Sequence, residues 1–234
     1  ILTYDSKHYW RREYFPQYKS NRKKGRDADS KDWNAIFETL NKIKAEIKEN
    51  LPYKFLEVYG AEADDIIATL CKFTQTEKDR SKNENIIIVS GDKDFIQLQK
   101  YVNVKQYSPI LKKYVDGHVP ETYIKEHILK GDTSDGVPNV LSPDNTFTDG
   151  LRQRPLGKKK IETWLDIDIN DLQDEVKRNY QRNEKLIDLS KIPNELEGEI
   201  LTEFHGAPFG DRSKLLNYFI KSRLKNLTET IGEF

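Results

Sequence analysis

The chain has 234 residues, 36% of them hydrophobic, and its 39 basic and 39 acidic residues cancel. This length allows one large domain or two small ones with a real core, and zero net charge gives no global attraction to nucleic acid. No apolar run approaches the roughly 20 residues that cross a bilayer, and the first residues lack the layout of a signal peptide. A lone cysteine, Cys71, excludes an internal disulfide framework. We therefore expect an intracellular protein with no membrane partner.

The N-terminal half alternates between the patterns of strands and helices. The apolar run 86–89 is typical of a strand covered on both faces of a parallel sheet, and apolar residues recur every three or four positions over 33–47. The polar stretch 25–31 is expected to be mobile. Expected strands cover 1–4, 55–58, 86–89 and 102–107, and expected helices cover 33–47, 63–73 and 94–98. The alternation indicates an α/β fold with a mostly parallel sheet flanked by helices.

The second half has a different character. Strand signals end near Thr122, and helical patterns cover 123–130, 158–165, 170–186 and 214–227. The segment 138–156 is rich in Pro, Asn, Asp and Gly and predicts a long loop. We therefore divide the chain into an α/β core at 1–121 and a helical region at 122–234.

A basic block lies near the N-terminus, between Lys7 and Arg26. It holds eight basic residues and one acidic residue, Glu13. A block of this kind attracts phosphate groups or simply remains solvated. The aromatic residues interleaved with it favour contact with nucleic acid, since bases stack on aromatic rings while phosphates pair with the cations.

Acidic residues recur where expected strands end or expected helices begin. The ligand site of an open α/β sheet lies outside the carboxyl ends of its strands, so these side chains should meet at one edge. Carboxylates this close repel one another unless cations neutralise them, and Mg²⁺ is the natural cation for a set of oxygen ligands. The alternative for any one acid is a helix cap or a solvated loop charge, and Asp65 fits that alternative best. The acids concerned are Asp5, Glu62, Asp64, Asp65, Asp92, Asp94, Asp132 and Asp135.

Several motifs resemble those of the flap endonuclease or 5′ nuclease family. GAEADDIIATL and SGDKDFIQL are similar to its paired acidic motifs, RREYFPQYKSNR to its basic motif, and GDTSDGVP to its second-metal segment. Members carried by T-even phages also have counterparts of YVNVKQYSPILKKYV, LIDLSKIP and LTETIGEF, so the resemblance spans the whole chain. It implies a PIN-like 5′ nuclease core with a basic arch at about 7–50, followed by a helical DNA-binding region with a segment like a helix-hairpin-helix.

The resemblance also implies an activity and its ligands. The expected reaction is 5′ to 3′ exonuclease and flap endonuclease cleavage of RNA primers and DNA flaps in phage replication, with two Mg²⁺ ions that Mn²⁺ can replace. The expected partners are DNA and RNA–DNA hybrids with 5′ ends or flaps, together with phage replication proteins, in the cytoplasm of the infected bacterial host.

Residue roles follow from the same resemblance. It assigns the first metal to Asp5, Glu62, Asp64 and Asp92, and the second to Asp94, Asp132 and Asp135. Lys19 and Arg22 match the catalytic basic residues that contact the scissile phosphate. Nucleic-acid binding is assigned to Arg11, Arg12, Lys23, Lys24, Lys158, Lys159 and Lys160. The alternative for Lys158, Lys159 and Lys160 is that they are the solvated start of a helix. This alternative stays open because the chain lacks the Gly-Ile-Gly hairpin of cellular members.

Two other functions remain open at this point. A PIN-type single-strand ribonuclease uses a similar sheet and similar acids, but it has no need of the segment 131–137 or of the basic arch. A catalytically incomplete nucleic-acid-binding fragment is the second. The chain opens at ILTYD, and in the family this strand follows an earlier one that carries another metal-binding aspartate. We therefore expect an N-terminally truncated chain that is inactive alone.

Overall fold

The computed structural model describes residues 1–76 and 82–234, without the side chain of Lys24. The N-terminal half contains β1 (Leu2–Thr3), α1 (Trp10–Tyr14), α2 (Asn21–Asp27), α3 (Trp33–Asn50), β2 (Phe55–Leu56), α4 (Ala63–Thr74), β3 (Ile86–Val89), the 3-10 helix η2 (Lys93–Lys100), β4 (Val104–Ser108) and β5 (Lys113–Val115). Gly25 lies inside α2, so the stretch expected to be mobile is partly helical.

The second half is helical, as predicted. Its elements are α5 (Pro120–Lys130), α6 (Lys158–Trp164), η3 (Ile169–Asp171), α7 (Asp174–Ile187), η4 (Leu189–Lys191), α8 (Asn194–Gly206), η5 (Arg212–Lys214), α9 (Leu215–Lys221), α10 (Lys225–Glu229) and η6 (Ile231–Glu233). The predicted helix at 214–227 is interrupted between α9 and α10, where Arg223 adopts φ +55°. Among the described residues, no helix is both long and apolar enough to cross a bilayer.

The strands form two small sheets. β1 pairs in parallel with β2, with Leu2 opposite Phe55. β3 pairs in parallel with β4, and β4 pairs with β5 in antiparallel orientation. The expected alternation of strands and helices is present, but the hydrogen-bonded ladders of the two sheets do not join within the described residues.

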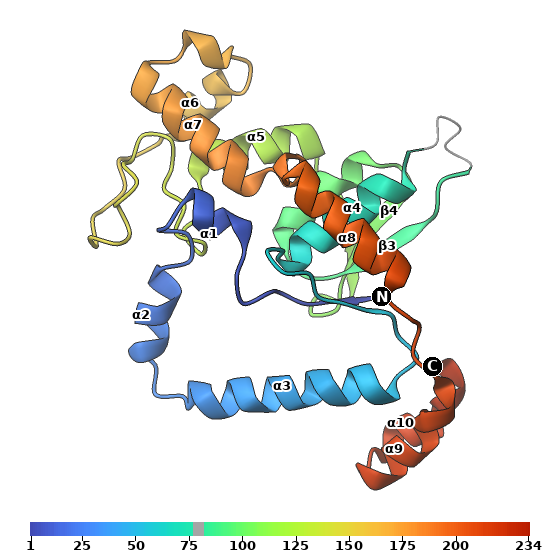
Figure 1. Cartoon of the computed structure of the whole chain (residues 1–234). Helices are drawn as coiled ribbons and strands as arrows, with labels where there is room; N and C mark the ends of the chain where they lie inside the picture. Colours follow the sequence, from blue (N-terminus) through green and yellow to red (C-terminus); the bar gives the residue numbers. More distant parts are fainter. Residues whose placement is uncertain (77–81) are drawn as a thin grey trace.

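The largest core cluster combines both halves of the chain. Buried side chains of α4 and β3, such as Ile66 and Ile88, pack with Leu196 and Ile200 of α8. The sequence reading missed α8, although it begins after Pro193 and places apolar residues four positions apart. Figure 1 shows α8 lying against α4 beside the strands. The helical region therefore shares a core with the α/β region.

One prediction about β3 is wrong. The strand was expected to be covered on both faces, yet the side chains of Ile87 and Val89 are 55% and 67% exposed. Only Ile88 is fully buried, because α4, η2 and α8 lie on one side and no described element covers the other. Four consecutive aliphatic residues show that a strand is apolar, but they do not show which of its faces has a partner.

The helices α2 and α3 leave the body of the protein and return to it at β2 (Figure 1). None of the residues of α3 is fully buried, and Phe37, Leu40 and Ile43 are exposed. The C-terminal helices lie beside the returning end of α3, where the Tyr218 hydroxyl donates to Glu46 at 2.9 Å. A Cβ atom on Gly210 would lie 1.9 Å from the carbonyl oxygen of Leu51, so this contact requires glycine.

The predicted long loop is present between α5 and α6. It is held by α7, whose Asn183 amide donates to the carbonyl oxygens of Ile128 and Pro138, both at 2.8 Å. Asn179 donates to the carbonyl of Val140 at 3.0 Å. These amides pair buried backbone carbonyls that have no secondary structure to satisfy them. The loop is therefore a fixed part of the fold.

Candidate metal centre

The turn after α5 positions two acidic residues, Asp132 and Asp135. Asp132 and Val137 exchange backbone hydrogen bonds of 2.8 and 2.7 Å, which closes the turn. Gly131 has φ +68°, and a Cβ there would lie 2.4 Å from the carbonyl oxygen of Val137, so no other residue fits. Asp132 Oδ1 accepts hydrogen bonds from the backbone and hydroxyl of Ser134, which fixes its carboxylate.

The start of α4 carries a second pair of acids. Glu62 is the N-cap, and its backbone N–H donates to Asp65 Oδ2 at 2.9 Å in a capping box. The backbone N–H of Ala63 donates to Asp5 Oδ1 at 2.7 Å, which ties the carboxyl end of β1 to this helix start. Asp64 is thereby placed on the first turn, where the helix dipole favours negative charge.

The third pair follows β3. Asp92 caps the 3-10 helix η2 by accepting from the backbone N–H of Asp94 at 3.0 Å. The buried Gln106 amide on β4 donates to the carbonyl oxygens of Ser90 and Asp92, which fixes the backbone between strand and helix. The two carboxylates therefore lie at the carboxyl end of β3, where the sequence places them.

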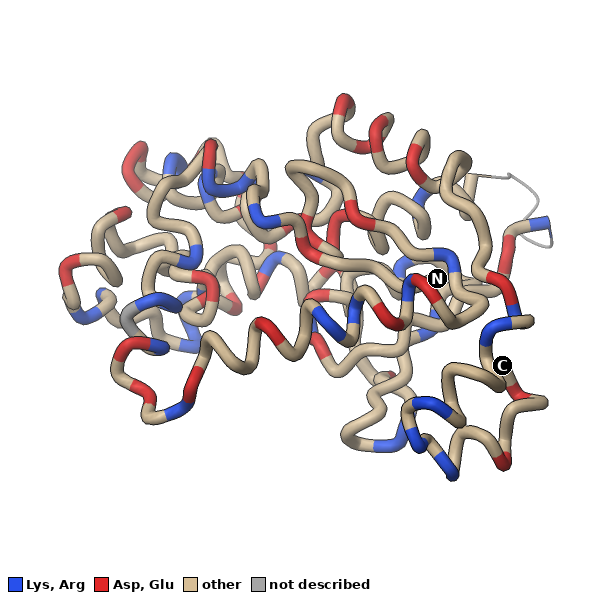
Figure 2. Tube along the Cα trace, turned by 60° about the horizontal axis from the view of Figure 1, so that its bottom comes forward, with Lys and Arg blue, Asp and Glu red and all other residues tan. Residues whose placement is uncertain are grey.

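Side chains from these segments gather into two overlapping groups. Carboxylate oxygens of Asp64, Asp92 and Asp94 lie within 4.8 Å of one another. Asp94 also belongs to a second group of the same size with His127 and Asp132. Figure 2 shows acidic positions in red among basic positions in blue along the middle of the molecule. Asp94 is thus the carboxylate that the two groups share.

The carboxylates destabilise one another's charged forms. Burial and the neighbouring charges of Asp92 and Asp94 raise the pKa of Asp64 to about 7. Burial raises the pKa of Asp94 to about 7 as well, with Asp92 and Asp132 adding to the effect and His127 opposing it. A bound cation favours the ionised forms of such carboxyl groups, so these acids form a favourable site for one.

His127 on α5 is a member of this centre that the sequence reading missed. Its Nδ1 lies 3.3 Å from Asp94 Oδ1 and its Nε2 lies 3.6 Å from Asp132 Oδ2. Burial alone would lower the pKa of the imidazole, but the two carboxylates outweigh it and the pKa is raised. The signal available in the sequence was a histidine one helical turn before the acidic turn at 131–137.

Two predicted basic residues contact the predicted metal ligands. Lys19 Nζ donates to Glu62 Oε1 and lies 3.5 Å from Asp135 Oδ2, and the Arg22 guanidinium donates to Asp135. Burial would lower the pKa of Lys19, but Asp135 and Glu62 raise it. Tyr18 donates its hydroxyl to Glu62 at 3.1 Å and lies 2.7 Å from Asp135 Oδ2. Glu62 and Asp135 are therefore ion-paired here and stand outside both groups, as Asp5 does.

Arg11 does not fit the nucleic-acid role assigned to it. Its side chain is 3% exposed, and its guanidinium bonds Glu62 at 2.9 Å, Asp65 at 2.8 Å and the carbonyl of Leu186 at 2.8 Å. Each of the three guanidinium nitrogens lies against one of these partners, and the group is almost fully buried, so a phosphate does not reach it. Trp10 donates its indole N–H to the same Asp65 at 3.2 Å. Arg11 is part of the buried network behind the centre, and assigning it to nucleic-acid binding was wrong.

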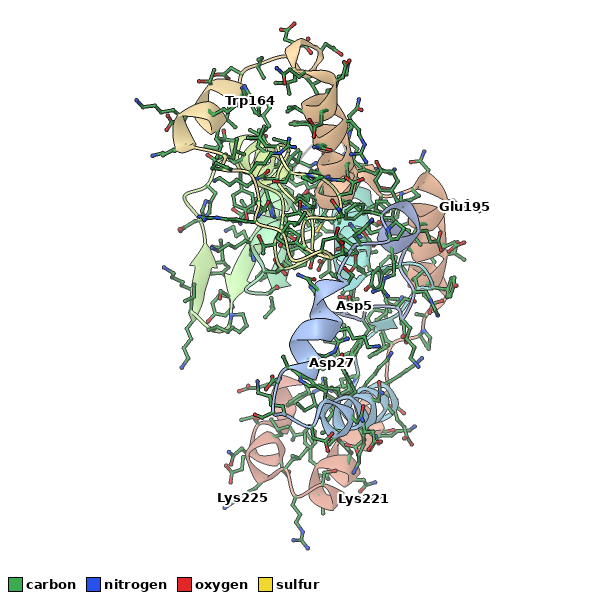
Figure 3. The ribbon with its side chains drawn as sticks, turned by 90° about the vertical axis from the view of Figure 1, so that its left-hand side faces the viewer. Asp5, Asp27, Trp164, Glu195, Lys221 and Lys225 are labelled. Carbon is green, nitrogen blue, oxygen red and sulfur yellow. The ribbon has the colours of Figure 1, made fainter. Side chains whose placement is uncertain are left out.

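None of the other predicted binding residues whose side chains are described pairs with an acid of the two groups. Arg12 and Lys23 are exposed near the start of the arch, and the side chain of Lys24 lies outside the described part of the chain. Lys158, Lys159 and Lys160 are exposed on α6. Figure 3 labels Trp164, on the same helix, at the end of the molecule opposite Lys221 and Lys225, with Asp5 between them.

The donor set suits divalent metal ions. Carboxylate oxygens are the ligands that Mg²⁺ and Mn²⁺ take, and separations below 4.8 Å allow one ion to reach several of them. The carboxyls whose pKa rises to about 7 show that the chain alone leaves this charge uncompensated. The residues therefore fit a metal centre.

Known proteins resemble the chain along its whole length. Residues 1–128 match the family model described as 5′-3′ exonuclease, N-terminal resolvase-like domain, and residues 118–234 match the one described as T4 RNase H, C terminal. The chain is 36% identical to the ribonuclease H of Enterobacteria phage T4 over 97% of this chain and 75% of that protein. It is 35% identical to a 5′-3′ exonuclease of Buchnera aphidicola over 60% of this chain and 47% of that protein.

Solved structures show the same fold. The flap endonuclease of bacteriophage T5, in a pseudo-enzyme–product complex with DNA and metal ions, has a TM-score of 0.60 and 17% identity over 87% of this chain and 80% of that one. The T5 5′-exonuclease with bound divalent zinc has a TM-score of 0.59 and 17% identity over 87% of this chain and 81% of that one. With two family models covering its length, the chain belongs to the 5′-3′ exonuclease family of 5′ nucleases.

Proposed function

We propose that this protein uses Mg²⁺ to hydrolyse phosphodiester bonds near the 5′ ends of RNA primers and DNA flaps during DNA replication. The observation that carries the proposal is the meeting of carboxylates from separate chain segments, with Lys19 beside them. The ribonuclease H of phage T4 and the flap endonuclease of phage T5 are named for activities of this class.

The carboxylates divide the metal binding between two positions. Asp64 and Asp92 serve the first position and Asp132 serves the second, with Asp94 close to both. Bound Mg²⁺, which Mn²⁺ can replace, supplies an activated water molecule and neutralises charge on the phosphate. The remaining carboxylates are Asp5, Glu62 and Asp135. They contribute to metal binding directly or through water, or they orient Lys19.

Lys19 and Arg22 stabilise negative charge at the scissile phosphate. Both are paired with carboxylates in the free protein, and Arg22 is 45% exposed on its side chain. A phosphate that arrives between Lys19 and the acids gives this ammonium a third anionic partner, besides Glu62 and Asp135. A positioned cation stabilises the charge that develops on the phosphate oxygens as the bond breaks.

Binding of the strand is spread over the two halves of the chain. Arg12, Lys23 and Lys24 serve the 5′ single strand at the arch, where aromatic residues also lie, and Lys158–Lys160 serve the duplex. In this proposal the α/β core at 1–121 cleaves the strand, and the helical region at 122–234 binds the duplex. DNA and RNA–DNA hybrids are the substrates, and phage replication proteins in the cytoplasm of the bacterial host are the partners.

The test is digestion of 5′-labelled flap, nick and RNA-primer substrates with and without Mg²⁺. We expect Mg²⁺-dependent cleavage at the 5′ end or junction. Asp92→Asn should abolish cleavage while leaving substrate binding largely intact, because distant basic residues dominate affinity. Asp166→Asn, which changes an exposed acid of the helical region, is the control. Equal cleavage by parent and Asp92→Asn would refute the site, and junction-independent cutting of single-stranded RNA would favour a PIN-type ribonuclease.

A further inference from the structure

The centre contains one nitrogen donor, the imidazole of His127, among its carboxylate oxygens. It projects from α5 between two acids that belong to different segments, Asp94 after β3 and Asp132 in the turn after α5. Its side chain is 16% exposed, and its Nδ1 atom is fully buried. The described residues of both metal groups otherwise offer only carboxylate oxygens.

One ring nitrogen, Nδ1, has no hydrogen-bond partner in the described part of the chain. Nδ1 lies 3.3 Å from Asp94 Oδ1 but lacks hydrogen-bond geometry and has no partner. The other ring nitrogen, Nε2, faces Asp132 Oδ2 at 3.6 Å. A buried polar atom without a partner costs roughly 1 to 3 kcal/mol, so such atoms are rare unless something else binds them. One ion shared with the adjacent carboxylates supplies that partner.

We propose that His127 is a direct ligand of the second metal position, together with Asp94 and Asp132, and that this position prefers a first-row transition ion over Mg²⁺. The inference rests on the proposed function for the metal centre and adds the identity of one ligand. Mg²⁺ takes oxygen ligands, whereas imidazole nitrogen suits first-row transition ions such as Fe²⁺ or Zn²⁺. Mn²⁺, a first-row ion that also takes carboxylate oxygen, is the paramagnetic probe. The alternative is an imidazole that only holds Asp94 and Asp132 near each other.

Pulsed EPR of the whole chain loaded with Mn²⁺ distinguishes these two roles. A coordinated imidazole gives a nitrogen-14 modulation of the Mn²⁺ signal, and we expect it in the parent protein. It should disappear in His127→Asn and in His127→Gln, both checked for parental secondary structure by circular dichroism. His118→Asn is the matched control, because it removes an exposed histidine that precedes the same helix.

Calorimetric titration adds a second readout. We expect His127→Asn to weaken Mn²⁺ binding by at least roughly 10- to 100-fold, the cost of losing even a side chain that only orients a metal ligand, and to change Mg²⁺ binding much less. Bound Mn²⁺ without nitrogen coupling in the parent, or coupling that persists in both His127 variants, overturns the proposal. In either case Mg²⁺-dependent flap cleavage by the parent leaves the proposed function standing. Failure to bind Mn²⁺ or Mg²⁺ at all refutes the metal centre itself.

Discussion

At the scale of single residues, the basic side chains beside the centre already pair with two acids that stand outside both metal groups, Glu62 and Asp135. Lys19 sits beside both Glu62 and Asp135, and its backbone N–H donates to the carbonyl of Asp135 at 2.7 Å. Its φ of +56° is unusual for a residue with a side chain. Strained backbone of this kind clusters at functional sites. The base of the arch is thereby fixed to the acidic turn.

This arrangement makes Lys19 the basic residue whose loss should affect catalysis most. Lys19→Ala should slow cleavage of a 5′ flap by roughly 10²- to 10³-fold, the usual cost of removing one positioned group that stabilises the transition state. Single-turnover rates at saturating Mg²⁺ measure the effect without contributions from binding. Lys23→Ala, an exposed neighbour, should weaken binding while its saturated rate stays near that of the parent. If Lys19→Ala cleaves at the parental rate, Lys19 has no role in catalysis and only pairs with acids in the free protein.

Arg11 should affect stability rather than nucleic-acid affinity. Arg11→Ala leaves Asp65 buried without its main cation, and breaking a buried ion pair costs about 3 to 5 kcal/mol. Denaturant unfolding measures the change. Its neighbour Arg12 is exposed, so Arg12→Ala should change the free energy of unfolding by no more than about 0.5 kcal/mol. Equal stability of the two variants would contradict the buried network.

At the scale of elements, the sequence pattern predicted the helices and strands whose positions depend on neighbouring residues. The helices α3 and α4 and the strand β3 lie close to their predicted positions, because periodicity and capping are local signals. The covering of β3 depends on which distant elements pack on it, and the sequence reading had missed one of the three on its buried side, α8. Likewise, the acids were evident at strand ends, whereas the burial of Arg11 and the place of His127 depend on contacts between segments far apart in the sequence.

The loop between α5 and α6 also depends on such contacts. Asn183→Ala removes donors to two buried carbonyl oxygens, and each carbonyl left unpaired costs roughly 1 to 3 kcal/mol. We expect faster hydrogen exchange across 138–157 and a lower free energy of unfolding. Gln181→Ala on the same helix is the control, since its side chain is exposed. Unchanged exchange in the loop would show that its conformation does not depend on α7.

At the scale of the whole molecule, the centre is built by both halves of the chain, which also share their largest core cluster. Asp64 comes from α4, Asp94 from η2 and Asp132 from the turn after α5, inside the helical region. Together they place several negative charges where both halves of the chain meet. An ion bound there stabilises the folded state by mass action, because the unfolded chain has no such site. The stability of the folded state, the binding of metal and the pH are therefore linked.

The pH dependence of that link has a definite sign. The pKa values of Asp64 and Asp94 rise from 3.8 to about 7 in the folded, metal-free protein, so from about pH 4 to pH 7 this state retains protons that the unfolded state has released. Their contribution to stability is full below about pH 4 and declines as the pH rises towards 7. Divalent ions compete with these protons, so Mg²⁺ or Mn²⁺ should raise the unfolding temperature more at pH 7.5 than at pH 5.5. Calorimetry of the parent and of Asp94→Asn, each with metal and with chelator, measures this difference. The variant should lose much of it, and an equal metal effect at both pH values in the parent would show that these two carboxyls do not control metal binding.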